Sequence, residues 1–261
     1  MRVDLHNHTP LCNHAKGEPQ KYIQQAIKVG IDIFGFSDHA PMQFDTKYRM
    51  NLSQSKIYEQ DILNLKEQYK DQIDILLGYE VDYMSNPAFL EKDILNANVD
   101  YLIGSVHFLD SWGFDNPEFL QQYQNKDIDK IWEDYFEAIT NMAKTNYFNI
   151  VGHLDLIKVF KFLPKKDIKL IASKALKQIK KSNMVIEINS AGFAKPIGEQ
   201  YPSISLLELA FELDIPITFG SDAHSIDKIG YKYDQVKKIA QNIGYTKCTI
   251  FRNKQQEIYR F

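Results

Sequence analysis

Seven short runs rich in Val, Ile, Leu, Phe and Tyr recur along the chain. They cover Val3–His8, Ile33–His39, Ile75–Tyr83, Tyr101–Phe108, Phe148–Leu154, Met184–Asn189 and Ile215–Gly220. Runs of this length and composition predict β-strands. Between them apolar residues recur at helical spacing, as in Ile128, Ile131 and Tyr135. The pattern therefore predicts an alternation of strands and helices.

Turn and capping residues agree with this alternation at several element ends. Pro19 stands where a helix would begin, and Gly30 stands where that helix would end. Ser205 is followed three residues later by Glu208, a spacing typical of a capping box at the start of a helix.

Repeated strand–helix units predict a mostly parallel sheet, because parallel neighbours need a crossover between them. Seven such units favour a (β/α)7 barrel similar to the TIM barrel, with an open doubly wound sheet as the alternative. No linker or repeat divides the chain, so we expect one domain over 1–261. The long segments 41–55, 110–126 and 191–203 follow strands, which predicts loops gathered on one face of the barrel.

Composition narrows the possible functions. The chain has 261 residues, 44% hydrophobic and 25% charged, which excludes disorder and collagen. Two cysteines are too few for a disulfide scaffold. The net charge of -3 argues against long nucleic acid as a partner. No apolar stretch approaches membrane-spanning length and the first residues lack a signal-peptide pattern, so we expect a cytoplasmic protein.

The seven histidines are placed in a pattern. All lie at or just beyond the carboxyl end of a predicted strand, and none lies in a predicted helix: His6, His8, His14, His39, His107, His153 and His224. Because these strand ends share one face of a barrel, we expect the imidazoles to converge there.

Short local motifs point to a metal site. His6 and His8 have the two-residue spacing that sends both side chains to one side of a strand. Asp38 precedes His39, and Asp222 lies two residues before His224. Each motif alone also fits a structural alternative, either a hydrogen-bonded core histidine or a helix-capping aspartate.

A second set of residues extends this signal. Glu80 ends an apolar strand, where it is either a surface residue or a carboxylate shared between two cations. His107 and His153 each end a strand of their own. So many nitrogen and oxygen ligands require at least two divalent ions, and the ligand types suit Zn, Mn or Fe.

Six motifs in the same order resemble a known family. They are Leu5–Thr9 with Cys12–His14, Ser37–Pro41, Gly78–Tyr83, Ser105–Phe108 with Trp112–Asp115, Gly152–Asp155, and Gly220–His224. They are similar to the motifs of the polymerase-and-histidinol-phosphatase (PHP) superfamily of metal-dependent phosphoesterases. The pieces around His107 and Trp112 resemble the stand-alone histidinol-phosphatases in particular.

The resemblance implies a distorted seven-stranded barrel with three divalent metal ions. By that likeness the ligands of the first ion are His6, His8, Glu80 and Asp222. Those of the second are Glu80, His107 and His153, and those of the third are His14, His39 and His224. Every ligand position of the family is filled, which is expected of an active enzyme.

The implied chemistry is hydrolysis of a phosphate monoester. A hydroxide that bridges two ions is a nucleophile at neutral pH, because metal binding lowers the pKa of water from 15.7 to about 7. We expect Glu80 and Asp38 to act at the catalytic centre. Asp38 either protonates the leaving alkoxide or orients a ligand histidine.

One segment departs from the family pattern. Where relatives often carry an arginine that binds phosphate, this chain has Ala194 followed by Lys195. Lys195, and Lys158 after His153, are the candidates to replace it, without the bidentate geometry of a guanidinium. The alternative for both is an ordinary exposed lysine.

The leading hypothesis is a histidinol-phosphatase that converts L-histidinol phosphate to L-histidinol and phosphate, a step of histidine biosynthesis. The alternatives are a PHP enzyme for another small phosphate ester or a nucleotide, a metal-binding protein without turnover, and an amidohydrolase. Four acids are unranked candidates to meet a cationic part of the substrate: Asp82, Asp110, Asp115 and Glu187.

Overall fold

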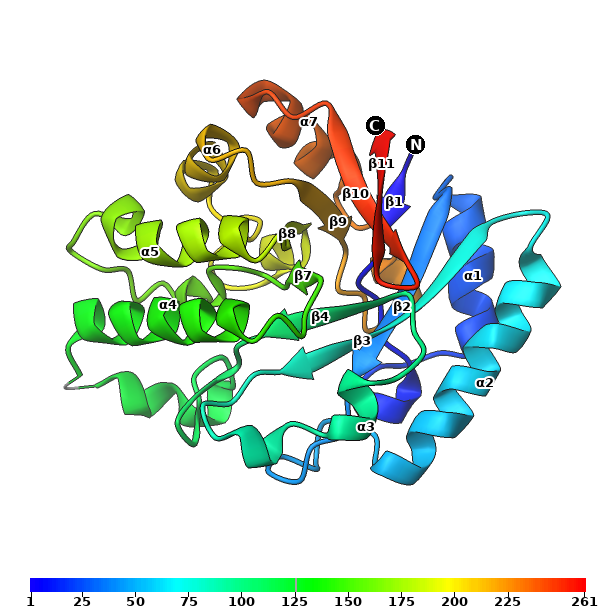
Figure 1. Ribbon diagram of the computed structural model, residues 1–261, viewed down its shortest axis with the longest axis horizontal. Coiled ribbons are helices and arrows are strands. Elements are labelled where there is room, and N and C mark those ends of the chain that lie inside the picture. Colours follow the sequence, from blue (N-terminus) through cyan, green and yellow to red (C-terminus); the bar gives the residue numbers. More distant parts are fainter. Residues whose placement is uncertain (125) are drawn as a thin grey trace.

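The computed structural model describes residues 1–124 and 126–261, and its centre is a sheet of seven parallel strands (Figure 1). The spatial order is β1-β2-β3-β4-β7-β8-β9. The strands are β1 (Val3–Asp4), β2 (Ile33–His39), β3 (Asp74–Asp82), β4 (Tyr101–Ser105), β7 (Ile150–Val151), β8 (Val185–Asn189) and β9 (Ile217–Gly220). The sheet curls into a nearly closed barrel, which confirms the predicted fold class.

The barrel closes where the first and last strands meet. Leu5 donates its backbone N–H to the carbonyl of Phe219 at 2.9 Å, and His8 donates to Ala223 at 3.0 Å. A parallel bridge also joins Asn7 to Ala223. We call this contact the seam, and it brings the start of the chain against a segment more than 200 residues away.

Among the described residues, seven α-helices surround the strands (Figure 1). They are α1 (Pro19–Lys28), α2 (Leu52–Tyr69), α3 (Lys92–Leu95), α4 (Ile128–Lys144), α5 (Ile168–Lys181), α6 (Ile204–Glu212) and α7 (Tyr233–Ile243). The connections that the structure describes contain six 3-10 turns: η1 (Pro10–Cys12), η2 (Pro87–Phe89), η3 (Pro117–Tyr123), η4 (Leu156–Lys158), η5 (Ala191–Ala194) and η6 (Ile226–Lys228). In α4 the apolar positions Ile131, Tyr135 and Ile139 are buried, as their spacing predicts.

Tyr101 fills the barrel interior. Its hydroxyl donates to the carbonyl of Leu5 at 2.6 Å, so it ties β4 to the strand at the seam. A Cβ placed on Gly78 would stand 2.6 Å from the Tyr101 ring. Glycine at this position is therefore what lets the ring lie across the backbone of β3.

The ends of α1 agree with the sequence prediction, whereas the start of α6 differs from it. Helix α1 begins at Pro19, and Gly30 follows its end in the left-handed conformation with φ 73°. The capping box expected at Ser205 is wrong, because α6 already begins at Ile204 with Ser203 before it. The side chain of Glu208 instead lies 3.2 Å from Lys169 on α5.

Two antiparallel hairpins were not predicted. Strands β10 (Lys247–Arg252) and β11 (Gln255–Arg260) pair near the chain termini, and β5 (Phe108–Leu109) and β6 (Trp112–Gly113) pair in the loop after β4. Arg252 of the first hairpin forms an ion pair with Asp74 at the start of β3. The terminal amine bonds the carbonyl of Arg260 at 2.9 Å, so the two ends of the chain lie together (Figure 1). Within the described residues no helix is both long and apolar enough to cross a membrane.

Asp4 is the polar anchor of the seam. It is buried and accepts bonds from the backbone and hydroxyl of Ser221 at 2.9 and 2.6 Å, and from the backbone of Gly230 at 3.2 Å. The side chain of Asn7 donates to it at 3.1 Å. These bonds tie β1 to the loop after β9.

Replacing Asp4 by alanine is expected to destabilise the fold, because several buried donors then lack an acceptor. A buried unpaired polar group costs about 1–3 kcal/mol, so we expect the free energy of unfolding in urea to fall by about 3 kcal/mol. The control is Asp32→Ala, which removes an exposed acid whose carboxylate, among the described residues, accepts from the backbone of Arg2 alone. Equal losses in the two variants would contradict a special role of Asp4.

Candidate metal centre

The nine residues expected to hold metal gather at the carboxyl ends of the barrel strands. Seven of them line one cavity of about 590 Å³: His14, His39, Glu80, His107, His153, Asp222 and His224. The remaining two, His6 and His8, are completely buried at the seam. The geometry brings together every residue of the expected set, while the assignment of ligands to individual ions stays a prediction.

Glu80 lies between two groups of histidines. Its Oε1 lies 2.9 Å from Nε2 of His153 and 3.6 Å from Nε2 of His107. Its Oε2 lies 3.3 Å from Nε2 of His6 and 3.0 Å from Nδ1 of His39. Burial alone would raise the pKa of Glu80, but His6, His39 and His107 hold it well below its ordinary value. A carboxylate with one oxygen toward each group is suited to bridge two cations.

Asp222 meets the two histidines that follow β1 across the seam. Its Oδ1 lies 3.1 Å from Nε2 of His8 and 3.8 Å from Nε2 of His6. His6, His8 and Asp222 have ligand atoms within 4.8 Å of one another, and the same is true of Glu80, His107 and His153. The second cluster has the residues of the second expected ligand set, and the first has three of the four residues of the first set, without Glu80.

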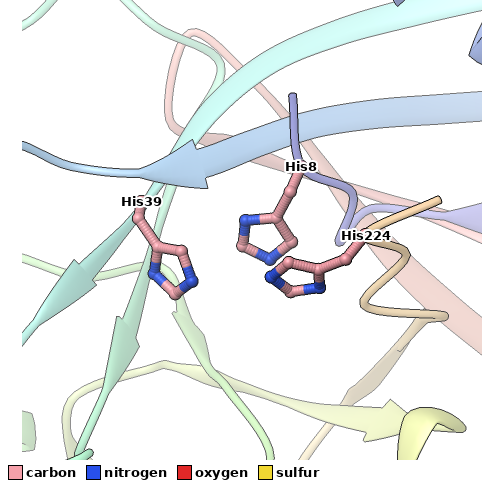
Figure 2. A group of neighbouring side chains, drawn as sticks. All are labelled: His8, His39 and His224. Carbon is pink, nitrogen blue, oxygen red and sulfur yellow. The ribbon is translucent and has the colours of Figure 1, made fainter. Parts of the chain in front are cut away.

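The third expected set lies toward the cavity mouth. The ring centroid of His14 is 5.2 Å from that of His39 and 4.5 Å from that of His224. His8 also belongs to this neighbourhood, because its ring stacks on His224 at 3.9 Å (Figure 2). Figure 2 shows the imidazoles of His8, His39 and His224 around one small space, and their ligand atoms lie within 4.8 Å of one another.

The outward nitrogen of several imidazoles is held by the protein. Nδ1 of His6 lies 2.7 Å from Glu187, Nδ1 of His14 lies 2.8 Å from the carbonyl of Cys12, and Nδ1 of His224 lies 3.1 Å from the carbonyl of Asp222. Such bonds fix the tautomer that leaves Nε2 free to bind metal.

His107 is held in the same way by a buried chain of charges. Its Nδ1 bonds Asp82, and Nη1 of Arg49 donates to the other oxygen of Asp82 at 2.6 Å. Burial would raise the pKa of Asp82, but Arg49 and then His107 lower it to about 2. Burial would lower the pKa of His107, but the charge of Asp82 raises it to about 10. Arg49 thus keeps Asp82 charged, and Asp82 orients His107.

The donor set fits divalent metal. Four buried imidazole nitrogens have no hydrogen-bond partner among the described residues: Nε2 of His6, Nδ1 of His39, Nδ1 of His153 and Nε2 of His224. Nε2 of His6 and Nδ1 of His39 both face Glu80 Oε2 without forming a hydrogen bond to it. Buried polar atoms are nearly always paired, and nitrogen with carboxylate oxygen is a ligand set for a borderline divalent ion.

The backbone is strained at two of the nine residues expected to hold metal. His153 and Asp222 have φ of 22° and 52°, values that side-chain-bearing residues rarely adopt. The backbone N–H of His153 is held by Glu187 at 2.9 Å. A Cβ on Gly220 would stand 2.6 Å from Cβ of His6, so only glycine allows β9 to approach β1 this closely. Strain of this kind concentrates at functional sites.

Asp38 is completely buried and does not line the cavity. Its Oδ2 accepts from the backbone of Thr9 at 3.2 Å and from the Thr9 hydroxyl. Its Oδ1 lies 3.4 Å from Nδ1 of His8 and accepts from the backbone of His39 at 2.9 Å. These contacts favour the orienting role over proton donation, because a proton donor must reach the substrate.

The two lysines expected to bind phosphate differ in position. Lys195 lines the cavity and is exposed. Lys158 is buried and lies 3.0 Å from Asp155 and 2.7 Å from Glu199. It also donates to the carbonyl of Gln200 at 2.9 Å. Lys158 therefore fastens two loops together, and Lys228, which the sequence did not point out, is a second lysine lining the cavity.

The four acids left unranked by the sequence are now distinguished. Glu187 binds His6, and Asp82 binds His107 and Arg49, so both support the centre. Asp110 is exposed at the tip of the β5–β6 hairpin. Asp115 lines the cavity. The supporting role of Glu187 had a sequence signal, because it is an acid in the middle of an apolar strand, whereas Arg49 had none.

Comparison with known proteins agrees with this geometry. The family model described as PHP domain matches residues 4–191. The chain belongs to the PHP family. A probable histidinol-phosphatase from Deinococcus radiodurans is 36% identical over 97% of this chain and 98% of its own length. The histidinol-phosphatase of Bacillus subtilis is 30% identical over 90% of this chain and 97% of its own length.

Solved structures share the fold. Histidinol phosphate phosphatase from Lactococcus lactis, complexed with zinc, L-histidinol and phosphate, superposes with a TM-score of 0.84. The superposition covers 98% of both chains at 22% sequence identity, so the two proteins share the same fold. A putative histidinol phosphatase from Listeria monocytogenes has a TM-score of 0.81 and 25% identity, covering 90% of this chain and 99% of its own.

Replacing Lys158 by methionine is expected to destabilise the protein, because Asp155 then loses its buried cation. Breaking a buried ion pair by removing one partner costs about 3–5 kcal/mol. We expect urea unfolding to show a loss of that size, whereas Lys161→Met, at an exposed lysine of the same loop, should leave stability within about 0.5 kcal/mol. A folded, fully stable Lys158→Met protein with weakened phosphate binding would instead make Lys158 a substrate contact.

Proposed function

We propose that this PHP protein is a histidinol-phosphatase that hydrolyses L-histidinol phosphate to L-histidinol and inorganic phosphate. The observation that carries the reaction class is the convergence of seven imidazoles, Glu80 and Asp222 at the base of one cavity. The similarity to curated histidinol-phosphatases over nearly the whole chain supports the substrate.

The residues in and around the cavity have different roles in a metal-dependent phosphoesterase. The histidines with Glu80 and Asp222 would hold divalent ions, three by the resemblance to the family and drawn from Zn, Mn and Fe, and Glu80 would be the carboxylate that two of them share. When bound, such ions supply Lewis acidity that activates water at neutral pH and neutralises phosphoryl charge. Glu187, Asp82 and Asp38 keep the histidines oriented. Lys195 and Lys228 attract the phosphate dianion into the cavity.

The chain acts as one unit over 1–261. The hairpin of β10 and β11 packs near the chain termini, and its Arg252 forms an ion pair with Asp74 at the start of β3, so it is attached to the barrel. Cys12 and Cys248 are both buried free thiols, which is consistent with the proposed location in the reducing cytoplasm.

The decisive measurement is phosphate release by the metal-loaded protein from L-histidinol phosphate, compared with a panel of sugar phosphates and nucleotides. We expect histidinol phosphate to give the highest kcat/KM. Metal content is measured on the same sample. Release from the panel without release from histidinol phosphate would contradict the substrate, and release from no ester would contradict the reaction class.

Replacing Glu80 by glutamine tests the site itself, because the amide loses the charge that faces both histidine groups. Changes in residues that only support a metal ligand already cost about 10–100-fold, so we expect kcat/KM to fall by more than about 100-fold and bound metal to decrease. Glu67→Gln, at an exposed acid of α2, is the matched control. Unchanged activity in Glu80→Gln would place the reaction elsewhere.

Replacing Lys195 by methionine is expected to raise the KM for histidinol phosphate and the inhibition constant of inorganic phosphate by about 10-fold each, as expected for one lost charged hydrogen bond. Metal content and stability should not change, because Lys195 is exposed. Lys195→Arg should retain both constants, since it keeps the charge. A fall in kcat without a change in KM would contradict this role.

A further inference from the structure

Strand β8 lies between β7 and β9 and carries none of the nine residues expected to hold metal (Figure 1). Each of the other six barrel strands carries at least one of them in its last residues or within two residues after it. In β8 the matching positions hold Glu187 and Asn189, and both are buried. Their two-residue spacing sends both side chains to the same face of the strand. A buried acid and a buried amide need polar partners inside the barrel.

The contacts of Asn189 fix the direction of its side-chain amide. Its backbone N–H donates to the carbonyl of Tyr201 at 2.7 Å, and its carbonyl accepts from the N–H of Tyr201 at 2.9 Å. Its side-chain Oδ1 accepts from the backbone N–H of Ala191 at 2.9 Å. Because a backbone N–H can only donate, the amide oxygen must face Ala191, and both hydrogens of Nδ2 are left for other partners.

The two hydrogens of Nδ2 face two carboxylates. Nδ2 of Asn189 donates to Oε2 of Glu187 at 3.1 Å and to Oδ2 of Asp222 at 3.3 Å. The second contact engages one oxygen of Asp222. The other oxygen, Oδ1, lies 3.1 Å from Nε2 of His8. The amide of Asn189 therefore determines which oxygen of Asp222 faces the imidazoles.

Glu187 connects Asn189 to two further residues of the expected metal-binding set. Its Oε1 lies 2.7 Å from Nδ1 of His6. Its Oε2, which accepts from Asn189, also accepts from the backbone N–H of His153 at 2.9 Å. Asn189 thus supports, directly or through Glu187, one expected ligand after each of β1, β7 and β9.

We propose that Asn189 is a positioning residue of the metal centre, which holds Asp222 with Oδ1 toward the two histidines that follow β1 and the ion they would bind. An amide suits this role because it is neutral. A cation in its place would neutralise Asp222 and weaken the attraction of this carboxylate for metal, whereas a hydrogen bond to Oδ2 leaves the charge available at Oδ1. The inference rests on the metal centre of the proposed function and is independent of the substrate.

The test measures the binding of Zn²⁺ alone to the metal-free protein, by competition with a chromophoric chelator. Asp222→Gly removes the carboxylate at a φ of 52° that glycine tolerates, and it identifies the binding step that depends on Asp222. For this step we expect Asn189→Ala to raise the dissociation constant about 10- to 100-fold, the usual effect of removing a residue that orients a metal ligand. In the Asp222→Gly background we expect Asn189→Ala to change the constant by less than about 3-fold, because the ligand that it orients is gone.

Two further variants complete the comparison. Asn64→Ala removes an exposed asparagine of α2 that bonds Gln60, and it should bind Zn²⁺ as the wild type does. Asn189→Ser leaves a smaller cavity than alanine and has a hydroxyl too short to reach both carboxylates, so we expect the same loss as for Asn189→Ala. Urea unfolding of the metal-free proteins checks that each variant is folded.

Equal losses with and without Asp222 would make Asn189 a general support of the barrel and overturn the positioning role. An unchanged constant in both Asn189 variants, failure of both to fold, or wild-type binding of Zn²⁺ by Asp222→Gly would also overturn it. If the wild type binds no Zn²⁺, the metal centre and the proposed function fail together. If Zn²⁺ binding depends on Asn189 as expected but histidinol phosphate is not hydrolysed, the proposed function fails and the positioning role stands.

Discussion

The structure depends on the burial of the Glu80 carboxylate among imidazoles. A buried carboxylate is stable only when positive charge or strong hydrogen-bond donors surround it, and here His6, His39, His107 and His153 provide that environment. Each of these histidines lies at the end of a different strand or just after it, so the barrel must place all the strand ends correctly around a single side chain. These histidines also bond residues away from Glu80, as His6 bonds Glu187, so further parts of the barrel must be placed correctly as well.

Much of this arrangement was predictable because strand ends in a parallel barrel share one face. An apolar run followed by a histidine, as at His39 or His153, defines both the element and the direction of its last side chain. The expected metal-binding set therefore came together without knowledge of any distance. The strand boundaries were less accurate where pairing is brief, as in β1 and β7, which are only two residues long.

What could not be predicted depends on contacts between distant loops. The residues next to Lys158 are like those around any lysine that follows a strand. Only the structure shows that its side chain is buried and forms ion pairs with Asp155 and Glu199. Glu187 was read as a possible substrate contact because periodicity gives the face of a strand but not the partner on that face. Arg49 lies in the loop between β2 and α2 and bonds Asp82, 33 residues later, a pairing that no local pattern contains.

The seam has a consequence for how the protein matures. His6 and His8 meet Asp222 only after the first and last barrel strands have joined, so a partly folded chain holds at best an incomplete set of ligands. Metal bound at this centre would therefore favour the closed barrel over open forms, and by mass action it would shift the population toward closure. The ions expected at this centre would in that way stabilise the closed form of the whole barrel. Metal supply in the cell would then govern the lifetime of the folded protein as well as its activity.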